Sequence, residues 1–151
     1  MEFVRGSSSY TRIEAHVCFN VKYRHNVFDF ADFKDRCMQI FQEVAEQIKV
    51  QIIEIGFDRN HVHMDIGIRA HYSFSWIAKK FKGVSGLKLL REFPQIKKRF
   101  FWGSGLWSPA LYVDSVGRDP EVVCNYIRNQ GKKKELRTNG VNKNVMDFLR
   151  A

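Results

Sequence analysis

The sequence predicts an α+β fold: a ferredoxin-like (split βαβ) antiparallel sheet with helices on one face, plus a C-terminal helix that carries a tyrosine. Short segments in which apolar and polar residues alternate indicate half-buried strands. Longer segments with apolar residues at helical spacing indicate amphipathic helices. These segments follow the order β-α-β-β-α-β-α, and the first six match the split βαβ pattern.

The first strand and the first helix are predicted from clear periodic patterns. Apolar and polar residues alternate from Ile13 to Tyr23, which is typical of a strand with one buried face. A helix follows and runs to about Lys49, with Asp29 or Asp32 as its capping residue. Its apolar residues form one stripe, which we expect to pack against the apolar face of the sheet.

A β-hairpin is predicted next. Residues 50–57 are rich in β-branched side chains and indicate the second strand. Asp58-Arg59-Asn60 supplies a tight turn, and residues 61–70 form the third strand. In this third strand the apolar residues share one face, and the opposite face carries His61, His63, Asp65, Gly67 and Arg69.

The second helix is expected from Trp76 to about Glu92, with Ser75 as its cap. Gly83 and Gly86 weaken the helix, so we expect a bend or a break there. Pro94 ends this segment.

A loop rich in Phe, Trp and Gly spans residues 100–109, and residues 111–116 predict the fourth strand. Asp119-Pro120-Glu121 is typical of a helix start, and Gly131 is a suitable stop for that last helix. The final helix is expected to cover the polar face of the sheet.

Length and composition indicate one globular domain. Of the 151 residues, 44% are hydrophobic. We assign residues 1–9 to a flexible leader and residues 10–151 to a single catalytic domain. No apolar run approaches the roughly 20 residues that span a bilayer, and no signal peptide is apparent. The three cysteines lack a Cys-x-x-Cys motif, which favours reduced thiols in a cytoplasmic protein.

The strongest compositional signal is the formal net charge of +9. A positive field of this size favours polyanionic partners, first nucleic acid and second an anionic membrane surface. Candidate phosphate contacts are basic residues of the second helix, of the last helix and of the segment that follows it: Lys79, Lys80, Lys82, Arg128, Lys132 and Lys133. The aromatic residues of the 100–109 loop either stack on bases or pack in the core.

A metal site is predicted from a strand pair and a helix pair. His61 and His63 lie two residues apart in a strand, so both imidazoles point to one face and can hold a divalent ion. Tyr126 and Gln130 lie four residues apart in the last predicted helix and share a face. A carboxamide oxygen from Gln130 would complete a mixed nitrogen and oxygen set that suits Mg²⁺ or Mn²⁺, although zinc also fits the ligand type. Tyr126 is then the candidate nucleophile on a scissile phosphate.

Several stretches together resemble the single-tyrosine HUH transposases, the TnpA-like enzymes of small insertion sequences (insertion sequence 200/605 group). The resemblance runs from Cys18 to Gln130. Its motifs are Cys18-Phe19-Asn20-Val21-Lys22-Tyr23-Arg24, Asn60-His61-Val62-His63-Met64-Asp65, Lys82-Gly83-Val84-Ser85, Tyr112-Val113-Asp114-Ser115-Val116-Gly117 and Tyr126-Ile127-x-x-Gln130.

The resemblance implies a single-strand DNA transposase that excises and inserts a small insertion sequence. It implies that His61, His63 and Gln130 bind the metal and that Tyr126 is the nucleophile. Attack would leave a 5′-phosphotyrosine and a free 3′-hydroxyl, later rejoined without a nucleotide cofactor. It also implies a homodimer that recognises single-stranded DNA with hairpin ends.

Two other interpretations remain open from the sequence. The same order of strands and helices occurs in non-catalytic RNA-binding modules, although no ribonucleoprotein-type aromatic motif lies on the central strands. A metal-dependent phosphodiesterase would use His61 and His63 with water as the nucleophile. We prefer the transposase because Tyr126 and Gln130 share a helix face.

Overall fold

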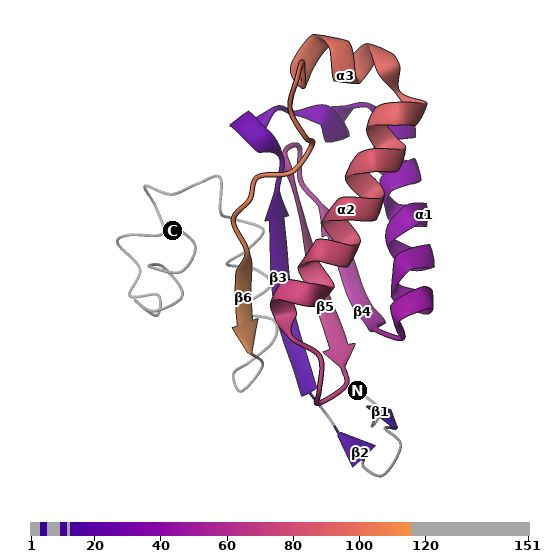
Figure 1. Cartoon of the computed structure of the whole chain (residues 1–151), viewed down its shortest axis with the longest axis vertical. Coiled ribbons are helices and arrows are strands. Elements are labelled where there is room, and N and C mark those ends of the chain that lie inside the picture. The colour runs from indigo at the N-terminus through magenta and orange to yellow at the C-terminus, as the bar shows by residue number, and fades with distance from the viewer. Residues whose placement is uncertain (1–3, 6–9, 12, 116–151) are drawn as a thin grey trace, which may run out of the picture.

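The computed structural model of the chain describes residues 4–5, 10–11 and 13–115 (Figure 1). In chain order its elements are β1 (Val4–Arg5), β2 (Tyr10–Thr11), β3 (Ile13–Asn20), η1 (Lys22–Arg24), η2 (Val27–Asp29), α1 (Ala31–Ile48), β4 (Gln51–Phe57), β5 (His61–Ile68), α2 (Phe74–Glu92), α3 (Pro94–Phe100) and β6 (Tyr112–Ser115). The predicted last helix, with Tyr126, Gln130 and Gly131, lies outside the described residues.

Four strands form an antiparallel sheet in the order β4-β5-β3-β6. Helices α1 and α2 lie side by side on one face of this sheet (Figure 1). The predicted α+β fold with an antiparallel sheet and helices on one face is therefore confirmed. The order is that of the split βαβ pattern, because α1 connects β3 to β4 and the hairpin partner β5 fills the space between them.

The core lies between the sheet and the two long helices. From the sheet, alternate residues of β5 point into it: Val62, Met64, Ile66 and Ile68. From α1, residues at helical spacing meet them: Phe33, Cys37, Ile40, Phe41 and Val44. Aromatic rings fill the centre, with the Phe41 centroid 6.0 Å from that of Phe19 and 5.2 Å from that of Phe81. The alternation in the sequence thus correctly identified the face of the sheet that packs against the helices.

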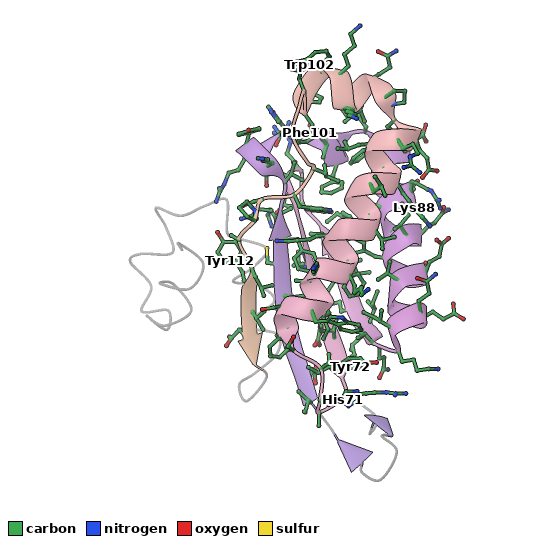
Figure 2. The ribbon with its side chains drawn as sticks, in the orientation of Figure 1. His71, Tyr72, Lys88, Phe101, Trp102 and Tyr112 are labelled. Atoms are coloured by element: carbon green, nitrogen blue, oxygen red, sulfur yellow. The ribbon has the colours of Figure 1, made fainter. Side chains whose placement is uncertain are left out.

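A hydrogen bond joins the C-terminal end of α1 to the segment between β5 and α2. Helix α1 ends at Lys49, whose φ of 59° is left-handed. The Tyr72 hydroxyl donates to the Ile48 carbonyl oxygen over 2.7 Å. Figure 2 shows Tyr72 and His71 between β5 and α2, at the end of the sheet away from α3. The bond satisfies one of the carbonyls that a helix end leaves open.

Both predicted helix caps were wrong. Helix α1 follows Phe30 and has no side-chain cap, because Asp29 pairs instead with Arg59 (Oδ2 to Nη2, 2.7 Å). Helix α2 is capped by Ser73, whose Oγ accepts from the Trp76 amide at 3.1 Å; Ser75 lies inside the helix.

Other departures concern the ends of elements. Helix α2 continues without a break through Gly83 and Gly86. The first strand ends at Asn20, and Tyr23 (φ 60°) lies in the left-handed region, so the alternation beyond Asn20 is not extended strand. Pro94 begins α3, which the sequence did not predict.

Two further points concern the predicted leader and the membrane. β1, inside the predicted leader, pairs with β2, just after it, as a small antiparallel sheet; the boundary at residue 9 stays a prediction. None of the helices in the described part of the chain has the length and apolar character that crossing a membrane requires.

Candidate active site on the polar face of the sheet

The face of the sheet opposite the helices is polar, and we call it the histidine face. Strand register places its members next to one another, because paired residues in adjacent strands point the same way. The members are His61, His63 and Asp65 of β5; Glu14, His16, Cys18 and Asn20 of β3; Tyr112 and Asp114 of β6; and Glu54 and Gly56 of β4.

The two predicted metal-binding histidines are brought together, as the strand spacing required. Their ring centroids are 6.3 Å apart, and the ring planes meet at 47°. Both side chains are buried: His61 is 3% exposed and His63 is 6% exposed. Two imidazoles held by neighbouring positions of one rigid strand form a pre-organised pair of nitrogen donors.

Neighbours in the preceding turn fix the orientation of His61. Its Nδ1 lies 2.9 Å from Oδ1 of Asn60, so the protonated Nδ1 donates this hydrogen bond and Nε2 carries the lone pair. Asp58 Oδ2 lies 3.7 Å from Nε2. A carboxylate at this distance adds negative charge beside Nε2, which suits a bound metal ion.

The ring of His63 lies against β4 at Gly56. A Cβ atom added at Gly56 would lie 2.6 Å from His63 Nε2 and 3.2 Å from Nδ1. The ring therefore uses a space that a side chain at position 56 would fill. Together with the donor chemistry of the pair, this cradle fits an imidazole held ready to bind a divalent ion.

The described residues supply the two imidazoles of the candidate metal site. These residues contain no group of three or more His, Cys, Asp or Glu side chains that could hold a metal ion. The two imidazoles supply nitrogen donors, and a complete site needs additional oxygen donors. Gln130, the predicted third ligand, and Tyr126, the predicted nucleophile, both lie outside the described residues.

Two ionisable groups farther along the histidine face, Asp65 and His16, have pKa shifts that favour their uncharged forms. Burial raises the pKa of Asp65, and a hydrogen bond with Glu14 and the charges of Glu14 and Glu54 raise it further. Burial lowers the pKa of His16, and the carboxylates of Glu14 and Asp114 act against that shift. Both shifts favour the uncharged form of the group.

Cys18 faces His63 across the β3–β5 pair and is fully buried. Burial raises the pKa of its thiol to about 12, although the charges of Arg24 and Lys82 act in the opposite direction. A thiol with such a pKa is protonated at neutral pH and is not a ready metal ligand or nucleophile. Cys18 and Cys37 are both free thiols, as predicted.

The predicted DNA-binding lysines of α2 have different surroundings. Lys79 and Lys80 are exposed. Lys82 instead donates from Nζ to the carbonyl oxygens of Ser108 (2.8 Å) and Ala110 (2.6 Å), and burial lowers its pKa. Lys82 thus ties the segment before β6 to α2, a structural role that the sequence did not suggest.

A groove of about 680 Å³ lies between α2, α3 and the loop that follows. Its basic lining residues are Lys79, Lys82, Arg91 and Lys97, and Leu106 and Trp107 give it an apolar wall. Arg91 and Lys97 were missed as candidate phosphate contacts. Lys97 belongs to α3, which the sequence did not predict, and Arg91 lies in the last turn of α2. Arg128, Lys132 and Lys133 lie outside the described residues.

The aromatic residues of the loop serve two purposes. Phe101 is fully buried, and Trp107 is 8% exposed with its Nε1 donating to Ser85 Oγ at 2.9 Å. Trp102, in contrast, is 82% exposed. Figure 2 shows Phe101 and Trp102 at the end of α3. Core packing therefore explains Phe101 and Trp107, and Trp102 is available for stacking on a base.

Comparison with known proteins points to one family. The family described as "Transposase IS200 like" matches residues 9–130. The ISDra2 transposase TnpA of Deinococcus radiodurans is 26% identical over 135 residues, which cover 89% of this chain and 95% of that protein. The transposase for insertion sequence element IS200 of Salmonella typhimurium is 29% identical over 121 residues, covering 80% and 78% respectively.

Solved structures show the same architecture. A putative transposase from Deinococcus radiodurans superposes with a TM-score of 0.70 at 26% identity, covering 84% of this chain and 97% of that one. A REP-associated tyrosine transposase bound to a REP hairpin gives a TM-score of 0.55 at 14% identity, covering 95% and 79%. The second likeness shows the fold alone.

Proposed function

The chain belongs to the family of IS200-like transposases, and from this premise we propose that it is a metal-dependent single-strand DNA transposase acting through a 5′-phosphotyrosine intermediate. The observation that carries the proposal is the pair of buried imidazoles, His61 and His63, on one face of β5. Burying a polar ring costs free energy, and buried titratable groups gather at functional sites more often than elsewhere.

In the proposed cleavage step, the Tyr126 hydroxyl oxygen attacks the scissile phosphorus. A bond forms between this oxygen and phosphorus, the bond from phosphorus to the 3′ oxygen breaks, and that oxygen leaves as a free 3′-hydroxyl with a proton. Rejoining is the reverse attack by a 3′-hydroxyl on the phosphotyrosine. One phosphodiester-type bond replaces another in each step, so no nucleotide cofactor is needed.

The proposed cofactor is Mg²⁺ or Mn²⁺, held by His61, His63 and Gln130. When bound, it would polarise the scissile phosphate and neutralise charge that develops on it. The protein's own contribution is orientation: Asn60 fixes the tautomer of His61, and the strand holds both rings on one face.

The proposed partner is single-stranded DNA with hairpin ends, bound by a homodimer. The exposed Lys79 and Lys80, the basic groove beside α2 and the net charge of +9 support a phosphate-binding surface. The solved transposase with 14% identity is bound to a hairpin, and we extend this class of partner to the present chain. Buried free thiols at Cys18 and Cys37 accord with a cytoplasmic protein.

A water-dependent phosphodiesterase is the second candidate, because the two imidazoles support it equally well. The RNA-binding module is less favoured. Its sheet would present aromatic rings to bases, and here the polar face carries buried histidines and carboxyl groups.

The test is to trap the covalent intermediate. Wild-type protein, single-stranded DNA from the element ends and Mn²⁺ or Mg²⁺ should give a denaturation-resistant protein–DNA adduct. Tyr126→Phe should give neither adduct nor cleavage. His61→Ala combined with His63→Ala should abolish cleavage and retain DNA binding that weakens at higher salt, because the lysines supply the affinity. Cleavage by Tyr126→Phe at the wild-type rate would favour water as the nucleophile.

A further inference from the structure

Gly56 is the residue of β4 that lies opposite His63 of β5. Glycine weakens a strand, because it has no side chain to pack and has more conformational freedom to lose on folding. A glycine in this position therefore needs a reason. The usual one, a left-handed backbone, does not apply: among the described residues the only glycine with positive φ is Gly103.

The surroundings of Gly56 differ from those of Gly83, Gly86, Gly103 and Gly105. A Cβ atom would meet nothing within 4 Å at Gly83, Gly103 or Gly105, and would make an ordinary contact at 3.5 Å at Gly86. At Gly56 the same atom would lie 2.6 Å from Nε2 of His63 and closer still to its Cε1. The ring of His63 occupies the space of the missing side chain.

We propose that Gly56 is a positioning residue for His63: its lack of a side chain lets the imidazole lie against β4 in the orientation that binds the metal ion. This inference rests on the proposed function, in which His63 is a ligand. It adds a residue that has no side chain to act as a ligand and that acts through His63.

β5 lies between β4 and β3, so His63 has a neighbour on each of these two strands. Across β5 from Gly56, the register places Cys18, which is fully buried. With alanine at position 56, the distance from its Cβ to His63 Nε2 must grow from 2.6 Å to the 3.4 Å of an ordinary contact, so the ring must move. Metal sites hold their ligand distances to about 0.2 Å, so a shift of this size moves the His63 ring away from the position in which it and His61 could bind one metal ion.

The experiment compares Gly56→Ala with Gln51→Ala in the full chain. Mn²⁺ affinity is measured by calorimetry, with single-stranded DNA present, and thermal stability by circular dichroism. Gly56→Ala should weaken Mn²⁺ binding about 10-fold or more, the range typical of residues that orient ligands. Gln51→Ala, at an exposed position of the same strand, should bind Mn²⁺ as the wild type does and should change the melting temperature little.

Two additional measurements separate positioning from a general loss of structure. First, raising the Mn²⁺ concentration should restore cleavage by Gly56→Ala, which a folding defect would not allow. Second, Gly56→Ala should lower the melting temperature in the wild-type background and have a much smaller effect in a His63→Ala background, because the ring it displaces is gone. This second measurement does not depend on any metal.

The outcomes are distinguishable. Equal Mn²⁺ affinity in wild type and Gly56→Ala, or an equal fall in melting temperature in both backgrounds, would overturn the positioning role of Gly56. Failure of the wild type itself to bind Mn²⁺ with DNA present would instead overturn the proposed metal-dependent function.

Discussion

The two faces of the sheet share the same strands and are both buried, yet different forces hold them. On the helix side, β3 and β5 contribute apolar side chains that pack against aromatic rings. On the histidine face the alternate residues of the same strands are ionisable, and His16, His61, His63 and Asp65 are each at most 6% exposed. Burying apolar groups stabilises a fold, whereas burying ionisable groups costs free energy.

The pKa shifts on the histidine face show how that cost is limited. Burial shifts the pKa of His16 downward and the pKa values of Cys18 and Asp65 upward, so all three shifts favour the neutral form. These three groups therefore add little charge to the face. The lesson of the comparison is that one face packs the core that specifies the fold, and the other carries the polar residues of the proposed site.

The largest expected effect contrasts a residue of α1 that packs against the apolar face of the sheet with a residue on the histidine face. Phe41 is fully buried among Phe19, Phe81 and Trp107, so Phe41→Ala should lower the free energy of unfolding by about 3–5 kcal/mol. Asp65→Asn should not lower it at about pH 8, because the amide cannot ionise and can donate toward Glu14. Urea denaturation measures both values, and a larger loss in Asp65→Asn would reverse the assignment of the two faces.

An intermediate effect is expected at the cation that lies within the apolar layer. Lys82 lies over the ring of Phe19 (Nζ to centroid 5.4 Å) and donates to two carbonyl oxygens. Lys82→Met leaves these carbonyls without that donor and should cost about 1.5–3 kcal/mol of unfolding free energy.

The matched control is Lys79→Met, an exposed change on the same helix. It should alter stability by no more than about 0.5 kcal/mol and should weaken DNA binding, measured by fluorescence anisotropy. If Lys79→Met destabilises the chain as much as Lys82→Met does, the structural role assigned to Lys82 is wrong.

The smallest expected effect is a pH dependence from the histidine face. The folded chain holds the pKa of His16 below its ordinary 6.5, so between that lower value and 6.5 the unfolded chain binds more protons. The resulting stability is present above pH 6.5 and is lost as the pH falls through the folded pKa. Between about pH 7 and about pH 5, wild type should lose more unfolding free energy than His16→Gln, by under about 1.4 kcal/mol per pH unit. Identical pH profiles would contradict a buried neutral His16.

Much of the fold was predictable because its strands obey a period of two. Alternation assigned the buried face of β3 and β5, and the same alternation placed His61 and His63 together on the other face. The tyrosine half of the site remains a prediction, since Tyr126 and Gln130 lie outside the described residues.

The helix cap of α2 and the start of α3 were not predicted, because neighbouring residues give local signals of similar strength. Ser73 and Ser75 are both suitable residue types for a helix cap. Only Ser73 has the extended backbone of a cap, and Ser75 lies inside α2. Pro94 was interpreted as a stop, although proline at the first position begins α3. The role of Gly56 had a signal, since glycine inside a strand often marks close approach, but its partner becomes evident only from the strand register.

The irregular register of β4 has a consequence for how molecules of this protein meet one another. β4 lies at an edge of the four-stranded sheet, and Ile53 is an extra residue between the pairs made by Ile52 and Glu54. Such a bulge kinks and twists the strand. Edge strands with a straight backbone and an exposed isoleucine are templates for intermolecular β-pairing and fibre growth. The kink allows Ile53 to remain 38% exposed at an edge that offers no straight template to another chain.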